Sequence, residues 1–252
     1  MLRTIERTSQ LLKLFTLETP EWGITELATR LGWSTSTTHD LASSLTRIGL
    51  LQKSGNRRYT LGRRVLELSQ VVLGSSSLQM EARKGMEQFA AKHDETILLG
   101  VLAGGKVLFA DKIFSKFFLP NVLSTPDMRF NAHCTAAGKV ILSHLSAADL
   151  QNILNEHGLE PMTAQSIQSI VNLNQELEKI ERQGYAYAFE ESIIGLGCVA
   201  APIFSHQGKV VAALSITRSI QHFERHLDEY RNAVVRTAKQ VSKGLGYMIF
   251  TG

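Results

Sequence analysis

The fold is decided by the stretch from Ile24 to Leu61, which reads ITELATRLGWSTSTTHDLASSLTRIGLLQKSGNRRYTL. We expect a short helix with Thr25 as its N-cap, because a hydroxyl can accept a hydrogen bond from a free N–H of the first turn. Gly32 lets the backbone leave that helix, and Ser34 or Thr35 can cap a longer second one. Two helices joined by so short a turn are typical of a helix-turn-helix.

The second helix, which we expect to end before Gly49, has two different faces. The side that carries Leu41, Leu45 and Ile48 is expected to pack inward. The opposite side is polar and lacks long apolar side chains, which suits a helix that lies in a major groove about 12 Å wide. An ordinary solvated face is the alternative. The polar side carries Thr35, Ser36, His39, Asp40, Ser43 and Arg47.

A basic hairpin follows this helix, with Lys53, Arg57 and Arg58 around its turn. This arrangement predicts a winged helix-turn-helix whose wing lies along the DNA backbone. Residues 1–64 hold ten Lys and Arg against five Asp and Glu, whereas the remainder holds seventeen against eighteen. A positive charge confined to one end is typical of an attached DNA-binding module. The predicted DNA contacts are Thr25, Ser34, Thr35, Ser36, Thr38, His39, Asp40, Ser43, Arg47, Lys53, Arg57 and Arg58.

Three blocks of the sequence resemble one known family. GWSTSTTHDL (32–41) and YTLG (59–62) are similar to the winged helix-turn-helix of the isocitrate lyase regulator (IclR) family of bacterial transcriptional regulators. RFNAHCTAAGK (129–139) is similar to the family's central stretch, and GLGCVAAPI (195–203) with AALSI (212–216) to its C-terminal signature. The resemblance covers nearly the whole chain. It implies a DNA-binding regulator, a repressor rather than an activator, that responds to a small metabolite.

The expected fold class is α+β, with two domains in 252 residues. We place a winged helix-turn-helix at 1–62, a linker helix at 63–77, and an effector-binding, oligomerisation domain at 78–252. The first domain opens with a helix over 4–17, whose apolar side includes Ile5. The second alternates hairpins (96–102 with 106–114, and 198–204 with 209–217) with helices (78–93, 135–145, 147–157, 173–183 and 226–248). Hairpins at both ends predict a mixed sheet flanked by helices, which the resemblance specifies as GAF-like or PAS-like.

The residues favour no catalytic, metal or cofactor site. Cys134 and Cys198 have neither zinc nor redox spacing, and Glu190 and Glu191 face apart as neighbours. Ala136-Ala137-Gly138-Lys139 lacks the first glycine and the final hydroxyl of a phosphate loop. We therefore expect a protein that is not an enzyme. A hydrolase that uses Cys134 with His133 remains the less favoured alternative.

Ser215 and Thr217 share one face of a predicted strand, since side chains alternate along strands. Hydroxyls in an apolar setting cost free energy unless they are hydrogen-bonded, so either backbone groups or a ligand must satisfy them. Free N–H groups at the start of the helix at Thr135 are expected to offer an anion site. By resemblance, the effector pocket is lined by Phe130, Ala136, Ala137, Ala188, Leu196, Cys198, Ser215 and Thr217. This set has no Lys or Arg, which favours a neutral metabolite or a monocarboxylate, with Phe130 suiting an aromatic one.

Asp40 stands where the family usually has Arg, so the family's phosphate contact does not carry over to this position. A carboxylate there is unfavourable near phosphates unless it accepts from a cytosine amino group or pairs with a cation such as Arg47. The expected partners are double-stranded DNA with an inverted-repeat operator and a small organic effector. The resemblance also implies further copies of the chain in a homodimer or homotetramer. A ligand-independent DNA-architectural protein is the rival interpretation. No targeting segment and no apolar run of membrane-spanning length are found, so a cytoplasmic location is expected.

Overall fold

The computed structural model describes residues 2–16, 18–55, 57–74, 77–116 and 129–248. The chain divides into two compact units, Met1–Ser76 and Ser77–Gly252, and each is described by itself. Within the described residues, none of the helices combines the length and the apolar character needed to cross a membrane.

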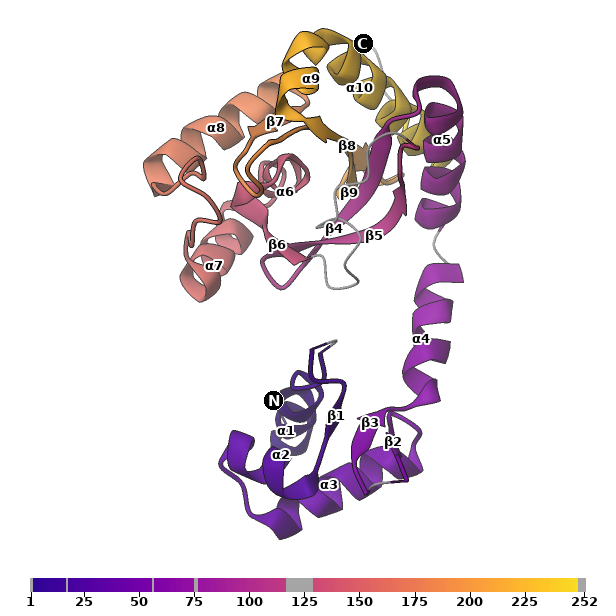
Figure 1. Cartoon of the computed structure of the whole chain (residues 1–252), viewed down its shortest axis with the longest axis vertical. Coiled ribbons are helices and arrows are strands. Elements are labelled where there is room, and N and C mark those ends of the chain that lie inside the picture. The colour runs from indigo at the N-terminus through magenta and orange to yellow at the C-terminus, as the bar shows by residue number, and fades with distance from the viewer. Residues whose placement is uncertain (1, 17, 56, 75–76, 117–128, 249–252) are drawn as a thin grey trace. The chain divides into compact units, whose positions relative to one another are not determined.

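The first unit is a winged helix-turn-helix (Figure 1). Its small antiparallel sheet has the strand order β1-β3-β2. Leu11, Ala42, Leu45, Leu51 and Tyr59 form its buried core, so the first helix, the third helix and the hairpin are fastened together. In chain order the elements are α1 (Arg3–Leu12), β1 (Glu21–Trp22), α2 (Ile24–Leu31), α3 (Thr35–Arg47), β2 (Leu51–Lys53), β3 (Tyr59–Leu61) and α4 (Arg63–Gly74).

The helix-turn-helix is bounded by caps. Gly32 adopts a left-handed conformation (φ 67°) after α2, and the Ser34 hydroxyl accepts from the Thr37 N–H at the start of α3. The expectation that Thr25 caps α2 is wrong. Helix α2 begins at Ile24, two residues earlier than expected, with Gly23 as its N-cap, and the Glu26 carboxylate accepts the Gly23 N–H at 2.9 Å.

Two further expectations for the first unit were wrong, and one strand was missed. Helix α1 ends at Leu12 rather than Leu17, and Leu17 itself lies outside the described residues. Ile5 and Ile48, expected to pack inward, are 55% and 60% exposed. The two-residue strand β1, which pairs with β3, was not expected.

The second unit is built on a six-stranded sheet with the order β6-β5-β4-β9-β8-β7. Every pairing among the described strands is antiparallel, so the expected α+β class is confirmed but the sheet is not mixed. The strands are β4 (Thr96–Ala103), β5 (Lys106–Ile113), β6 (Arg129–Asn131), β7 (Ala186–Phe189), β8 (Leu196–Phe204) and β9 (Val210–Ser219). The helices are α5 (Ser77–His93), η2 (Ala132–Cys134), α6 (Ala136–Leu142), α7 (Ala147–His157), α8 (Ile170–Gln183), α9 (Ile220–Arg225) and α10 (Leu227–Gly244).

Helices cover both faces of this sheet (Figure 1). Helices α5 and α10 bury Met86, Phe89 and Val241 against one face, together with Ile97 and Leu214 of the sheet. Helices α6 and α8 form a second apolar core against the other face. The predicted helices and hairpins of this unit are found, but α9 and the short strands β6 and β7 were missed. The closing helix spans Leu227–Gly244 rather than 226–248.

Two glycines in the motifs have packing roles. A Cβ on Gly138 would lie 2.1 Å from the Ala132 carbonyl oxygen, and one on Gly197 would lie 2.4 Å from the Phe223 ring. Both distances are far shorter than van der Waals contact, so these positions accept no side chain. Close packing of η2 on α6 and of α9 on β8 therefore accounts for these glycines without a phosphate or dinucleotide site.

Candidate functional site

Helix α3 presents the polar face that its sequence predicted. Thr35, Ser36, His39 and Arg47 are exposed along it. The Asp40 carboxylate is 79% exposed, and His39 Nδ1 lies 3.8 Å from it. Among the described residues no contact joins Asp40 to Arg47, so the carboxylate is free to meet a donor from outside the protein.

Thr38 does not belong to this face. Its side chain is completely buried, and its hydroxyl donates to the Ser34 carbonyl oxygen at 3.0 Å. The position of Thr38 on the helix already predicted that its side chain faces the core, and its complete burial agrees with that prediction. The expectation that Thr38 contacts DNA is therefore wrong.

Arg58 is committed to its own unit. Its guanidinium donates to both oxygens of Glu26, at 3.1 and 2.7 Å, and lies 3.1 Å from the Glu21 carboxylate. The Gly23 N–H and then Arg58 hold the pKa of Glu26 below its ordinary value. This network fixes the hairpin to α2, so we remove Arg58 from the expected phosphate contacts. Arg57 and Lys53, in contrast, are exposed beside the hairpin turn.

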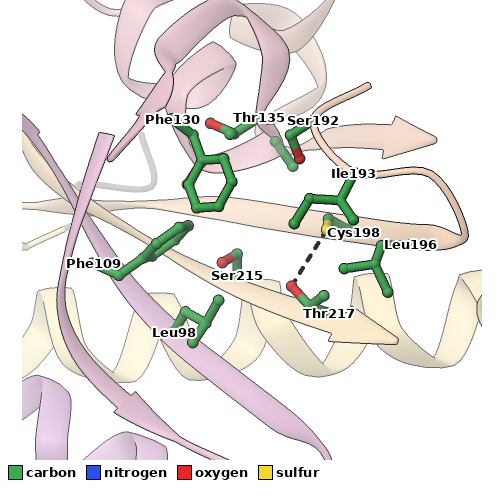
Figure 2. Close-up of a pocket in the computed structure, with 12 residues that line it drawn as sticks. Leu98, Phe109, Phe130, Thr135, Ser192, Ile193, Leu196, Cys198, Ser215 and Thr217 are labelled. Carbon is green, nitrogen blue, oxygen red and sulfur yellow. Dashed lines mark hydrogen bonds between the residues drawn. The ribbon is translucent and has the colours of Figure 1, made fainter. Parts of the chain in front are cut away.

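A partly open cavity lies in the second unit between the sheet and the start of α6 (Figure 2). It holds about 360 Å³ of space that atoms do not fill, including solvent at its mouth. No charged side chain of the described residues lines it. The lining residues are Leu98, Phe109, Phe130, Thr135, Ala136, Ala137, Ser192, Ile193, Leu196, Cys198, Ser215 and Thr217.

The hydroxyls of this cavity differ in their hydrogen bonding. The Thr217 hydroxyl lies 3.3 Å from Cys198 Sγ, and the Thr135 hydroxyl accepts from the Gly138 N–H at 2.9 Å. The Ser215 side chain is 3% exposed, and its Oγ has no hydrogen-bond partner among the described residues. Opposite it, Phe109 and Phe130 meet edge to face with their ring centroids 5.9 Å apart (Figure 2).

A loop held by buried contacts closes one side of the cavity with Ser192 and Ile193. The Lys139 ammonium, 2% exposed, lies 2.6 Å from a Glu191 oxygen. The Ser166 hydroxyl donates to the Glu191 carbonyl oxygen at 2.6 Å, so side chain and backbone of this residue are both fixed. Burial raises the pKa of Glu191 despite the neighbouring ammonium.

The structure brings seven of the eight predicted pocket residues together. Ala188 is the exception, because it lies in the apolar core beneath α6 and α8 and does not line the cavity. Sequence reasoning missed Leu98, Phe109, Thr135, Ser192 and Ile193. Thr135 was visible as a helix cap, but nothing local showed that the loop after Glu191 folds over the cavity.

The cysteines lack the surroundings of a nucleophile. Burial raises the pKa of Cys134, and raises that of Cys198 to about 11, so both thiols stay protonated at neutral pH. Burial also lowers the pKa of His133, which keeps its ring neutral at neutral pH. Within the described ranges, no group of three His, Cys, Asp or Glu side chains could hold a metal ion.

Comparisons with known proteins agree with this architecture. Residues 4–55 match the IclR helix-turn-helix domain, and residues 70–243 match the family described as bacterial transcriptional regulator IclR C-terminal. The chain is 30% identical to the HTH-type transcriptional regulator XynR of Escherichia coli over 98% of both chains. It is 26% identical to the transcriptional repressor IclR of Escherichia coli, over 89% of this chain and 83% of that one.

A solved structure extends the comparison to the fold. It is that of an IclR homologue from Microbacterium hydrocarbonoxydans in complex with 4-hydroxybenzoate, with a TM-score of 0.79. The two share 22% identity, and the match covers 96% of this chain and 98% of that one. The named relatives are transcriptional regulators, not enzymes. The two family matches and the full-length relative together show that this chain belongs to the IclR family of bacterial transcriptional regulators.

Proposed function

We propose that the chain is a DNA-binding repressor whose hold on its operator is controlled by a small organic effector in the cavity of the second unit. The proposal of a bound effector depends mainly on the Ser215 hydroxyl. Its hydroxyl is buried without a partner, on the wall of a cavity that is otherwise apolar. A buried unpaired hydroxyl costs free energy, and a ligand that hydrogen-bonds to it recovers that cost.

The walls of the cavity define the class of effector. Phe109 and Phe130 offer aromatic surface on one side, and Ser215 offers a hydrogen bond on the other. Without a lining cation among the described residues, a polyanion has no counter-charge there. We therefore propose a small aromatic or aliphatic molecule with one polar group, either neutral or a monocarboxylate. The relative that binds 4-hydroxybenzoate supports this class and supplies a probe.

Titration calorimetry on the full chain tests this proposal. The probes are 4-hydroxybenzoate, the neutral 4-hydroxybenzamide and a dicarboxylate such as phthalate. We expect one of the first two to bind and Ser215→Ala to weaken it by about tenfold, as expected for one lost hydrogen bond. Thr217→Val is the matched control, since the Thr217 hydroxyl already has a partner within the protein. Equal binding by wild type and Ser215→Ala would remove this hydroxyl from the proposal.

For the DNA part we propose that α3 enters the major groove and that the hairpin lies along the backbone. The proposed contacts are Thr25, Ser34, Thr35, Ser36, His39, Asp40, Ser43, Arg47, Lys53 and Arg57. Asp40, exposed and without an Arg or Lys partner among the described residues, is proposed to accept from a cytosine amino group. Selection from a randomised duplex pool with wild type and Asp40→Arg tests this, and identical selected sequences would refute it.

We further propose that different segments of the chain have different functions. Residues 1–62 bind DNA, 63–77 form the linker, and 78–252 bind the effector and associate with other copies in a cytoplasmic homodimer or homotetramer. Two symmetric DNA-binding units require an inverted-repeat operator, because half-site symmetry mirrors protein symmetry. Footprinting with sedimentation of the complex tests this. A footprint of one half-site, or binding without sequence preference, would favour the DNA-architectural alternative.

A further inference from the structure

The end of α3, the strand β2 and the start of α4 come together in the first unit (Figure 1). Their side chains line a basic groove. The groove is open to solvent. About 1050 Å³ of space within it is not filled by protein atoms, open solvent included. Four cations and one carboxylate belong to its lining. The lining residues are Thr46, Arg47, Ile48, Gly49, Leu51, Gln52, Lys53, Arg63, Arg64 and Glu67.

The cations of this groove are not used by the fold in the same way. Arg64 donates to a Glu67 oxygen at 2.7 Å and is thereby partly neutralised. Arg47, Lys53 and Arg63 have no carboxylate partner among the described residues of the structure. The groove therefore keeps a positive field that the protein does not itself compensate, which is the condition for binding an anion from outside.

Its position suggests which anion. Arg47 belongs to the polar face of α3, and Lys53 ends the first strand of the hairpin, so the groove connects the two elements proposed to touch DNA. Ile48, 60% exposed, is the apolar member of its rim and suits the apolar face of a deoxyribose. A sugar–phosphate backbone presents this combination of a row of anions and apolar sugars.

We propose that this groove holds a segment of the DNA phosphate backbone, with Arg63 as a phosphate contact contributed by the first turn of α4. The inference rests on the proposed DNA binding and adds to it a contact from outside the helix-turn-helix and the hairpin. Because α4 leads toward the second unit along the chain, DNA in this groove holds the first turn of the linker directly. Glu67 then opposes DNA binding, both by its own charge and by occupying Arg64.

Two substitutions with opposite expected effects on DNA affinity test the groove. Each phosphate contact adds about 0.9 to the slope of log affinity against log salt for duplex DNA. Arg63→Ala should weaken binding to a selected operator and to random duplex by the same factor, and should lower the slope by about one. Glu67→Gln should strengthen binding to both and steepen the slope, because it removes a carboxylate and frees Arg64.

The controls separate this inference from the proposed function. Lys84→Ala, in α5 of the second unit, leaves the groove intact and should leave affinity and slope at wild-type values. Inorganic phosphate at constant ionic strength should not compete with DNA, whereas a free-phosphate site would make it compete. If wild type prefers its operator but Arg63→Ala keeps the wild-type slope, or loses operator affinity alone, the groove inference is overturned while the function stands. If wild type shows no operator preference, the proposed function itself fails.

Discussion

Replacing Ser215 with alanine is expected to stabilise the ligand-free protein, although most substitutions of buried residues destabilise. The Ser215 Oγ is buried and has no hydrogen-bond partner among the described residues, and mutational data put the cost of such a group at about 1–3 kcal/mol. Removing one oxygen from the wall of an existing cavity sacrifices little packing. We expect a net gain of roughly 1 kcal/mol, which raises the melting temperature of a unit of this size by roughly 2–4 °C.

Thr217→Val is the matched control for stability. The Thr217 hydroxyl lies 3.3 Å from Cys198 Sγ, so its loss leaves a buried thiol without this partner. We expect stability to stay level or to fall by up to about 1 kcal/mol. Scanning calorimetry of the full chain is the assay, because two units need not melt together and only separate transitions give separate stabilities.

A lower melting temperature for Ser215→Ala than for wild type would refute this expectation, most clearly if the loss equals that of Thr217→Val. Such a result would mean that the Ser215 hydroxyl is already satisfied in the ligand-free protein. If instead the variant is more stable and also fails to bind the effector probe, the Ser215 Oγ lowers the stability of the protein but is needed for ligand binding. That opposition is typical of a functional site and not of a packing position.

Three further predictions test other parts of the structure. His133→Asn should flatten the pH dependence of the urea midpoint below pH about 6.5. Burial lowers the pKa of His133, so the unfolded chain takes up its proton first and stability is lost as pH falls through that window. Lys139→Met should cost about 3–5 kcal/mol by leaving Glu191 buried without its counter-ion, and adding Glu191→Leu should recover part of that loss in the same urea assay. Arg57→Ala should lower the salt slope of DNA binding by about one, whereas Arg58→Ala should lower the melting temperature of the first unit and leave the slope unchanged.

The elements that sequence predicted well are those with signals in their own residues. Ser34 caps the start of α3 with its hydroxyl, and Gly32 ends α2 in a left-handed backbone conformation. Both roles are set by the residue itself and its nearest neighbours in the sequence. Gly104 and Gly105 form the turn between β4 and β5 with φ of 56° and 70°, which a side chain adopts only at a cost. Where one or two residues dictate the backbone, the sequence is sufficient.

The missed elements depend on partners far along the chain. Strand β1 consists of Glu21 and Trp22, too few residues for any alternation to show, and it exists because it pairs with Thr60 and Tyr59. The choice of N-cap for α2 likewise depends on Glu26 reaching back to the preceding backbone. Short strands and competing caps therefore escape a local analysis.

The pocket shows the same division. Alternation along β9 correctly placed Ser215 and Thr217 on one face, since that follows from strand geometry alone. The contribution of Ser192 and Ile193 follows from an ion pair between Lys139 and Glu191, residues 52 positions apart in the sequence. Sequence predicted the floor of the cavity from local pattern, but the wall made by this loop required a long-range contact.

Charge is the property for which sequence and structure must be read together. The ten cations of residues 1–64 first indicated a DNA-binding module, yet Arg58 and Arg64 are paired with carboxylates among the described residues. Eight cations then remain to release counterions from DNA, so the salt slope for each DNA-binding unit should not exceed roughly seven in magnitude. A steeper slope would require one of these ion pairs to open on the duplex. Because Glu26 holds Arg58 against α2 while Glu67 holds Arg64 in the basic groove, we expect the groove pair to be the one that opens on DNA.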